Sequence, residues 1–191
     1  MSESYEVEVK AIITDSEEMK QRLLDIGAEM LNSEIQIDTY YDHPCRSFQE
    51  TDEAIRVRTR RPLDDQELDT TRSQNELTYK GPKVDKKTKT RLEYSVGIDK
   101  TDAVSSILQS LDFKPVAVVT KKRIFFDLRD ITISVDDVEQ VGQFLELESI
   151  VHKKDEMESA KSLIFKILNE LGIDSNNMVR DSYLELYLSR K

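Results

Sequence analysis

Apolar and polar residues alternate with a period of two along most of this chain, which is the pattern of half-buried β-strands. Residues 5–13 are the first example, since Val7 and Val9 alternate there with charged side chains. Strands and helices do not alternate regularly, so the pattern argues against a parallel, doubly wound sheet. The same reading predicts eight strands, at residues 5–13, 35–41, 54–60, 76–80, 90–96, 116–128, 131–136 and 144–150.

Four segments instead have the period of an amphipathic helix. Asp15 and Asp155 are expected to cap two of them, and Gly172 is expected to end the longest. These helices and an antiparallel sheet make an α+β protein. The helices are predicted at residues 15–30, 101–111, 155–171 and 182–188. The second is predicted to turn four apolar residues inward, namely Val104, Ile107, Leu108 and Leu111.

Length and composition narrow the class of protein. The 191 residues fit one domain, 1–191, with a polar and mostly acidic insertion at about residues 62–76. No apolar run approaches the roughly 18 residues of a membrane span, and the acidic N-terminus lacks a secretory signal, so a cytoplasmic protein is expected. The single Cys45 excludes an intramolecular disulfide. A net charge of −10 argues against a nucleic-acid partner.

Like charges recur two residues apart on single strand faces, where they stand about 7 Å apart and repel each other. Stability alone gives little reason for such pairs. They make sense if the faces converge on a shared interior, as in a closed antiparallel barrel with a charged lumen and helices over its apolar outer faces. The pairs are Glu6 with Glu8, Arg56 with Arg58, Lys121 with Arg123, and Glu146 with Glu148.

The two signs of charge suit two kinds of ligand. Guanidinium groups bind phosphate oxygens bidentately, and carboxylates suit a hard divalent cation such as Mg²⁺. Together they indicate metal-assisted phosphoryl or nucleotidyl transfer. The chain has no Walker A loop, so side chains must hold the phosphates. The basic candidates are Lys10, Arg56, Arg58, Lys80, Arg91, Lys121 and Arg123, with Lys122 and Arg60 as further candidates, and the acidic ones are Glu6, Glu8, Glu93, Asp136, Glu146 and Glu148.

Two other interpretations use the same residues. The charges could pair across strands as structural salt bridges, without any ligand. The basic face could also belong to a binding module that senses a polyphosphate or nucleotide and does no chemistry. A catalytic protein differs from both because it needs the carboxylates as a metal site.

At this point the motifs, in their order along the chain, resemble those of the CYTH superfamily, also called triphosphate tunnel metalloenzymes. Residues 6–10 are similar to its E-x-E-x-K signature. Residues 36–41, followed by 46–48, resemble the class IV adenylyl cyclase branch found in archaea and some bacteria, as do residues 180–184. The resemblance extends from Tyr5 to Leu188, and its other pieces are 55–58, 78–80, 91–93, 121–123, Asp136 and 142–148.

The resemblance implies a closed eight-stranded antiparallel tunnel that binds a triphosphate with Mg²⁺ or Mn²⁺. It implies that Lys10 and Arg123 are catalytic, with Lys10 orienting a phosphate or activating the nucleophile. The implied phosphate ligands are Arg56, Arg58, Lys80, Arg91, Lys121 and Arg123. The implied metal ligands are Glu6, Glu8, Asp136, Glu146 and Glu148.

The substrate and reaction stay open among the activities of that family. Its members include adenylyl cyclases, thiamine triphosphatases and inorganic tripolyphosphatases, so ATP, thiamine triphosphate and tripolyphosphate are the candidates. Cyclisation of ATP needs a base pocket, which the segment 36–41 with Phe48 could line; Tyr40, Tyr41 and Phe48 could equally be packing residues. The branch resemblance favours a cyclase. The oligomeric state is open, and a homodimer is compatible with the sequence.

Overall fold

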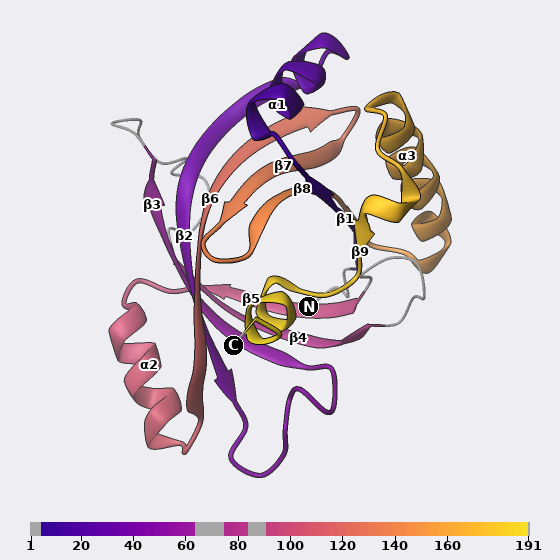
Figure 1. The fold of residues 1–191 in the computed structure, drawn as a ribbon. Coiled ribbons are helices and arrows are strands. Elements are labelled where there is room, and N and C mark those ends of the chain that lie inside the picture. Colours follow the sequence, from indigo (N-terminus) through magenta and orange to yellow (C-terminus); the bar gives the residue numbers. More distant parts are fainter. Residues whose placement is uncertain (1–4, 64–74, 84–90, 191) are drawn as a thin grey trace.

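The computed structural model describes residues 5–63, 75–83 and 91–190. Its strands are β1 (Tyr5–Ile13), β2 (Glu29–Asp42), β3 (Ala54–Pro62), β4 (Asn75–Lys83), β5 (Arg91–Gly97), β6 (Lys114–Leu128), β7 (Ile131–Val138), β8 (Gly142–Val151) and the two-residue β9 (Met178–Val179). They form one sheet in the order β5-β4-β3-β2-β6-β7-β8-β1-β9. Because β5 also pairs with β1, the eight long strands close into an antiparallel barrel (Figure 1). The predicted α+β barrel is therefore confirmed.

The seam that closes the barrel, between β5 and β1, is short. β5 and β1 are joined through two residue pairs, Tyr5 with Leu92 and Glu6 with Arg91. By contrast, β1 pairs with β8 along its whole length, from Tyr5 to Ile13. The β1–β5 seam consequently places the acidic start of β1 directly beside the basic start of β5.

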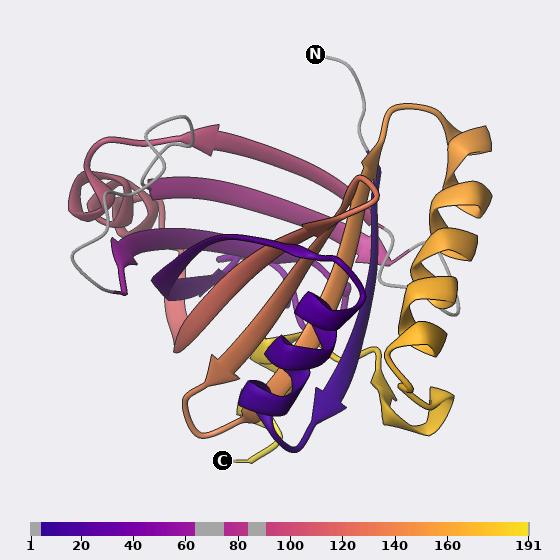
Figure 2. The same cartoon turned by 90° about the horizontal axis from the view of Figure 1, so that it is seen from above.

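The helices of the described residues are α1 (Ser16–Asp25), α2 (Thr101–Ser110), α3 (Met157–Glu170) and α4 (Tyr183–Leu188). α1 and α3 lie on the outer face of the sheet formed by β1, β7 and β8 (Figure 2). There Leu145 and Leu147 of β8 pack in one core with Ile164 and Ile167 of α3. The alternate residues of the same strand, Glu146 among them, consequently face the barrel interior.

Two predicted helices have different ends in the structure. The segment 15–30 is helical only to Asp25, because Gly27 takes a left-handed φ of 88° and the chain then enters β2 at Glu29. Asp15 does cap α1, accepting hydrogen bonds from the backbone N–H groups of residues 17 and 18. Asp155 does not cap α3, which begins at Met157 after a 3₁₀ turn.

The inward face predicted for α2 is also wrong in part. Leu108 is buried against Tyr41 and Val57, and Val104 packs against the same cluster. Ile107, however, is 58% exposed, and Leu111, just beyond the helix, is 59% exposed. The helix therefore meets the sheet through a narrower apolar stripe than its sequence period suggests.

The insertion predicted at about residues 62–76 separates β3 from β4, and residues 64–74 of it lie outside the described residues. β4 extends to Lys83, three residues beyond the predicted strand, and the rest of the lysine-rich segment falls outside the description as well. Among the described helices, none has the length and apolar character needed to cross a membrane.

Candidate functional site

The barrel interior holds a cavity of about 1010 Å³. It is lined by the inward-facing residues of the long strands and by residues 182–185 and 188–189 of the α4 region. All six predicted phosphate ligands line it, as do four of the five predicted metal ligands. These are Arg56, Arg58, Lys80, Arg91, Lys121 and Arg123, with Glu6, Glu8, Glu146 and Glu148.

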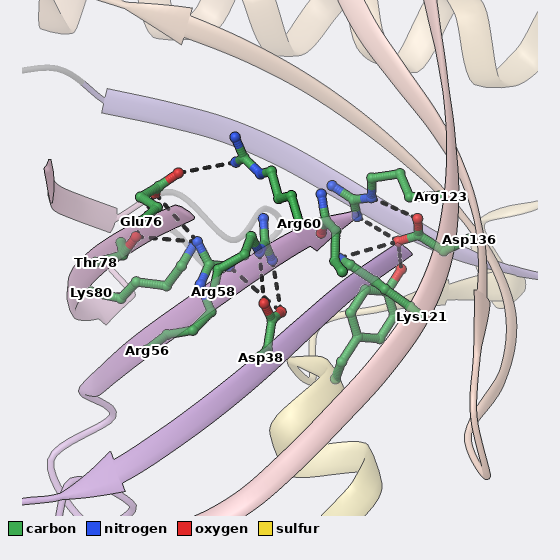
Figure 3. A network of polar contacts seen from close by, with 12 residues as sticks. Asp38, Arg56, Arg58, Arg60, Glu76, Thr78, Lys80, Lys121, Arg123 and Asp136 are labelled. Carbon is green, nitrogen blue, oxygen red and sulfur yellow. Dashed lines mark hydrogen bonds and ion pairs between the residues drawn. The ribbon is translucent and has the colours of Figure 1, made fainter. Parts of the chain in front are cut away.

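One wall is organised around Asp38, a residue that is 1% exposed on β2. Its two carboxylate oxygens accept hydrogen bonds from Nε and Nη2 of Arg58, at 2.6 and 2.7 Å (Figure 3). Arg56 Nη1 lies 3.9 Å from the same carboxylate. Burial works against ionisation of Asp38, but these two guanidinium groups outweigh it and hold its pKa well below its ordinary range. Asp38 therefore fixes the orientation of the arginine forks.

Glu76 of β4 extends this network. It lies 3.6 Å from Arg56 Nη2 and 3.0 Å from Arg60 Nη2, and its pKa is lowered to about 2 because the charge of Arg56 and a hydrogen bond from Thr78 outweigh burial. Arg56 Nη2 also donates to Thr78 Oγ1 at 3.2 Å. Arg56 Nε has no hydrogen-bond partner among the described residues. Arg56 is therefore held less tightly than Arg58 and keeps donor capacity for a ligand.

The adjoining part of the wall, on β6 and β7, repeats the arrangement with Asp136 of β7. Arg123 donates to both of its oxygens and also to Glu146, and Tyr183 Oη donates to Asp136 Oδ2 at 2.7 Å. Lys121 Nζ lies 3.6 Å from the same oxygen (Figure 3). Asp136 is 0% exposed and does not line the cavity. The structure thus places this predicted metal ligand beneath the cations, as their anchor.

Lys121 has an environment that suits proton exchange as well as anion binding. It is 2% exposed, and burial lowers its pKa to about 7, with the neighbouring charge of Arg123 as the second cause. The amine is consequently near half-protonation at neutral pH. It can bind a phosphate oxygen when charged and accept a proton when neutral.

Carboxylates gather at the third part of the wall, where β1 pairs with β8. Glu8 is the register partner of Glu148. Burial raises the pKa of Glu148 to about 8, and the charges of Glu6 and Glu8 add to the shift. Burial also raises the pKa of Glu6, against the attraction of Lys80. We call Glu6, Glu8 and Glu148 the acid cluster, since the charges of the first two make the ionisation of Glu148 less favourable.

The acid cluster offers the donors that a hard divalent cation requires. In the described part of the chain, no three His, Cys, Asp or Glu side chains stand close enough together to hold an ion by themselves. Mg²⁺ does not need three, because it commonly binds through one or two carboxylates together with water and substrate phosphates. The chemistry of the donors therefore fits Mg²⁺ or Mn²⁺ bound jointly by this cluster and a phosphate ligand.

Lys10, predicted to be catalytic, is 1% exposed and does not line the cavity. Its ammonium donates to the backbone carbonyl of Asp181 and lies 4.0 Å from the ring centroid of Tyr183 and 5.4 Å from that of Phe144. The sequence placed Lys10 on the inward face of β1, and the fold then covers it with the segment that leads into α4. Arg123, the other predicted catalytic residue, does line the cavity.

The sequence reasoning missed the residues that hold the arginines. Asp38 had a usable signal, since Gln36, Asp38 and Tyr40 alternate on one face of the predicted strand 35–41. Tyr183 lay in the segment 180–184 that resembles the cyclase branch, but the sequence did not indicate its contact with Asp136, which joins distant parts of the chain. Glu76 was predicted to begin the strand 76–80 at the border of the acidic insertion, and it does lie on β4, but its place in the cavity wall was missed.

The aromatic residues proposed for a base pocket are buried. Tyr40 packs with Val119 and Tyr183, and Phe48 lies 5.7 Å from His43, measured between ring centroids. Tyr40, Tyr41 and Phe48 also contribute to the cavity wall. Packing and ligand contact are thus both compatible with their positions.

With the charged cavity in place, comparison with known proteins identifies the family. Residues 4–183 match the CYTH domain. The chain belongs to the CYTH domain family. A protein of Methanocaldococcus jannaschii with the provisional name adenylate cyclase MJ0240 is 37% identical to it over 95% of this chain and 97% of its own length. Adenylate cyclase CyaB of Aeromonas hydrophila is 25% identical over 95% of this chain and 88% of its own length.

The solved structure of the PH1819 protein from Pyrococcus horikoshii is similar to this CYTH chain, with a TM-score of 0.85 and 40% sequence identity. The match covers 97% of this chain and 99% of that one. The predicted family and the predicted closed barrel are therefore both confirmed.

Proposed function

We propose that this CYTH protein is a divalent-metal-dependent enzyme that converts a triphosphate, and that its reaction is the cyclisation of ATP to cyclic AMP and pyrophosphate. One observation carries the proposal. A single cavity joins a wall of cations, with Arg56, Arg58 and Arg123, to the acid cluster. That combination serves a polyphosphate and its metal ion together.

The guanidinium groups of the cavity wall keep donor groups that their ion pairs do not use. Asp38 and Asp136 orient the guanidinium groups of Arg58 and Arg123, and each fork keeps N–H donors beyond those bonded to the carboxylates. Such preorganised donors bind phosphate oxygens without the cost of reorienting during the reaction. A purely structural salt-bridge network would not require a cavity of this size beside it.

Cyclisation joins the ribose 3′-oxygen to the α-phosphorus, breaks the bond from that phosphorus to the β-phosphate oxygen, and releases a proton and pyrophosphate. A bound Mg²⁺ or Mn²⁺ would supply charge neutralisation on the phosphates. Arg123 and Arg58 are placed to stabilise negative charge on the phosphate oxygens. Lys121, with its pKa near 7, is suited to accept the hydroxyl proton. Lys10 keeps Tyr183 in place in this arrangement and has no direct role in our scheme.

The choice of a cyclase is supported by the names of the two relatives and by the aromatic side chains at the cavity wall. The alternative is hydrolysis of tripolyphosphate or thiamine triphosphate, which needs only the phosphate-binding wall and a water molecule. A binding module without turnover is the third reading of the same cavity.

One assay separates these functions. The protein is incubated with ATP, GTP, thiamine triphosphate or tripolyphosphate in the presence of Mg²⁺ or Mn²⁺, and the products are identified by chromatography and mass spectrometry. A cyclase yields cyclic AMP and pyrophosphate and prefers ATP to GTP. Faster release of orthophosphate from tripolyphosphate, with no cyclic nucleotide, would replace the cyclase with the hydrolase. Binding of tripolyphosphate without any product would leave only a sensor.

A further inference from the structure

Lys80 lies at the border between the acid cluster and the arginines. Its ammonium donates a hydrogen bond to the carboxylate of Glu93 and lies 3.9 Å from Glu6 Oε2. Burial alone would lower the pKa of Lys80, but the charges of Glu6 and Glu93 outweigh burial and raise it. Lys80 is therefore a fully charged counter-ion of these carboxylates at neutral pH.

The same side chain is close to the phosphate-binding wall. Thr78 precedes it by two residues on the same face of β4 and accepts a hydrogen bond from Arg56. The charge of Arg56 is near enough to act on Lys80 as well. A lysine ammonium on its flexible four-carbon stem can exchange one set of oxygen partners for another by rotating. Lys80 can thus reach either carboxylates or phosphates without movement of the backbone.

We propose that Lys80 couples metal binding to triphosphate binding by exchanging partners. Its ammonium neutralises Glu6 and Glu93. A divalent cation that binds the acid cluster takes over the neutralisation of Glu6, and Lys80 then turns to the phosphate oxygens. This inference rests on the proposed function. The coupling is reciprocal, so a phosphate ligand that attracts Lys80 also makes the carboxylates more available to metal.

The test measures Mn²⁺ binding to the whole protein without any phosphate ligand, by electron paramagnetic resonance of free Mn²⁺. In Lys80→Gln the competing ammonium is gone, so we expect the Mn²⁺ dissociation constant to fall about tenfold. Lys83→Gln is the matched control, because Lys83 is also a lysine of β4 but its ion pairs are with Asp52 and Glu185 and not with a carboxylate of the acid cluster. It should change Mn²⁺ affinity less than twofold.

Lys80→Arg provides a second variant that retains the positive charge, and its Mn²⁺ affinity should stay close to that of the wild type. Circular dichroism establishes that all variants are folded. Equal effects of the Lys80 and Lys83 substitutions, or no effect of Lys80→Gln, would overturn the exchange. Failure of the proposed function gives a different result, since the wild type would then yield no cyclic AMP from ATP in the product assay, whatever Lys80→Gln does to Mn²⁺ binding.

Discussion

Asp38 and Arg58 form a bidentate ion pair across β2 and β3, with N···O distances of 2.6 and 2.7 Å and both residues buried. They are register partners on adjacent strands, so the correct register of β2 with β3 brings the two side chains together. The carboxylate fixes the guanidinium plane, and the remaining donors of Arg58 are then available to the cavity. The pair therefore contributes to the stability of the barrel and, in the proposed function, to phosphate binding.

Arg58→Ala should destabilise the protein by about 3–5 kcal/mol, because it leaves Asp38 buried without its main partner. Urea denaturation measures the loss. The double variant Arg58→Ala with Asp38→Ala should regain part of it, since no unpaired charge remains. Arg129→Ala, which breaks the exposed ion pair with Glu170, should hardly move the denaturation midpoint. Similar midpoints for Arg58→Ala and Arg129→Ala would show that the buried pair does not stabilise the fold.

Asp38 also shows what the sequence can and cannot reveal. Period-two alternation correctly predicted the inward faces of β1, β3, β6 and β8, because burial of one face fixes the parity of a strand. The alternation does not tell which charges pair. The family resemblance implied Asp136 as a metal ligand, and alternation alone could not indicate its hydrogen-bond partners in the structure, Arg123 and Tyr183. Pairing depends on strand order and register, which are properties of the whole barrel.

Tertiary contacts between distant segments account for the other differences. Lys10 was predicted to face a ligand, and its strand does turn it inward, but the chain leading into α4 returns to cover it. The predicted end of α1 was too late for a local reason. Apolar residues continue at helical spacing beyond Gly27, so the pattern did not show that the helix ends before this glycine. Helix ends depend on competition with the next element, here the long strand β2.

Arg56→Ala should weaken tripolyphosphate binding about ten- to a hundredfold, as expected for the loss of charge-assisted hydrogen bonds. Its ion pairs in the protein are long, at 3.6 and 3.9 Å, so stability should change less than in Arg58→Ala. Isothermal titration calorimetry gives the affinity, and urea denaturation gives the stability. An unaltered dissociation constant in a folded Arg56→Ala protein would place this side chain outside the binding site.

Tyr183→Ala should expose Lys10 to reagents that acetylate amines. The ring of Tyr183 lies over the Lys10 ammonium and contacts the ring of Phe144 edge-on. Tyr183→Phe is the matched control, because it keeps the ring and loses only the hydrogen bond to Asp136. Mass spectrometry after brief acetylation should show modified Lys10 in the alanine variant and protected Lys10 in the phenylalanine variant and the wild type. Rapid acetylation of Lys10 in the wild type would contradict the cover that we describe.

Glu148 should make the stability of the protein depend on pH in a predictable direction. Its pKa is raised from the ordinary 4.5 to about 8 by burial and by the charges of Glu6 and Glu8. Between these two values the folded protein binds more protons than the unfolded chain, so the free energy of unfolding falls as pH rises. Without divalent metal, the wild type should therefore lose stability from pH 5 to pH 8.

Glu148→Gln removes this titration and should lose less stability over the same range when both proteins are unfolded in urea with EDTA present. Glu17→Gln is the control, because Glu17 is 80% exposed and should leave the pH dependence of the wild type unchanged. Divalent metal requires the ionised carboxylate, so Mg²⁺ should stabilise the wild type more at pH 8 than at pH 6. If the free energy of unfolding changed with pH in the same way in the wild type and in Glu148→Gln, Glu148 would not bind the proton that its raised pKa implies.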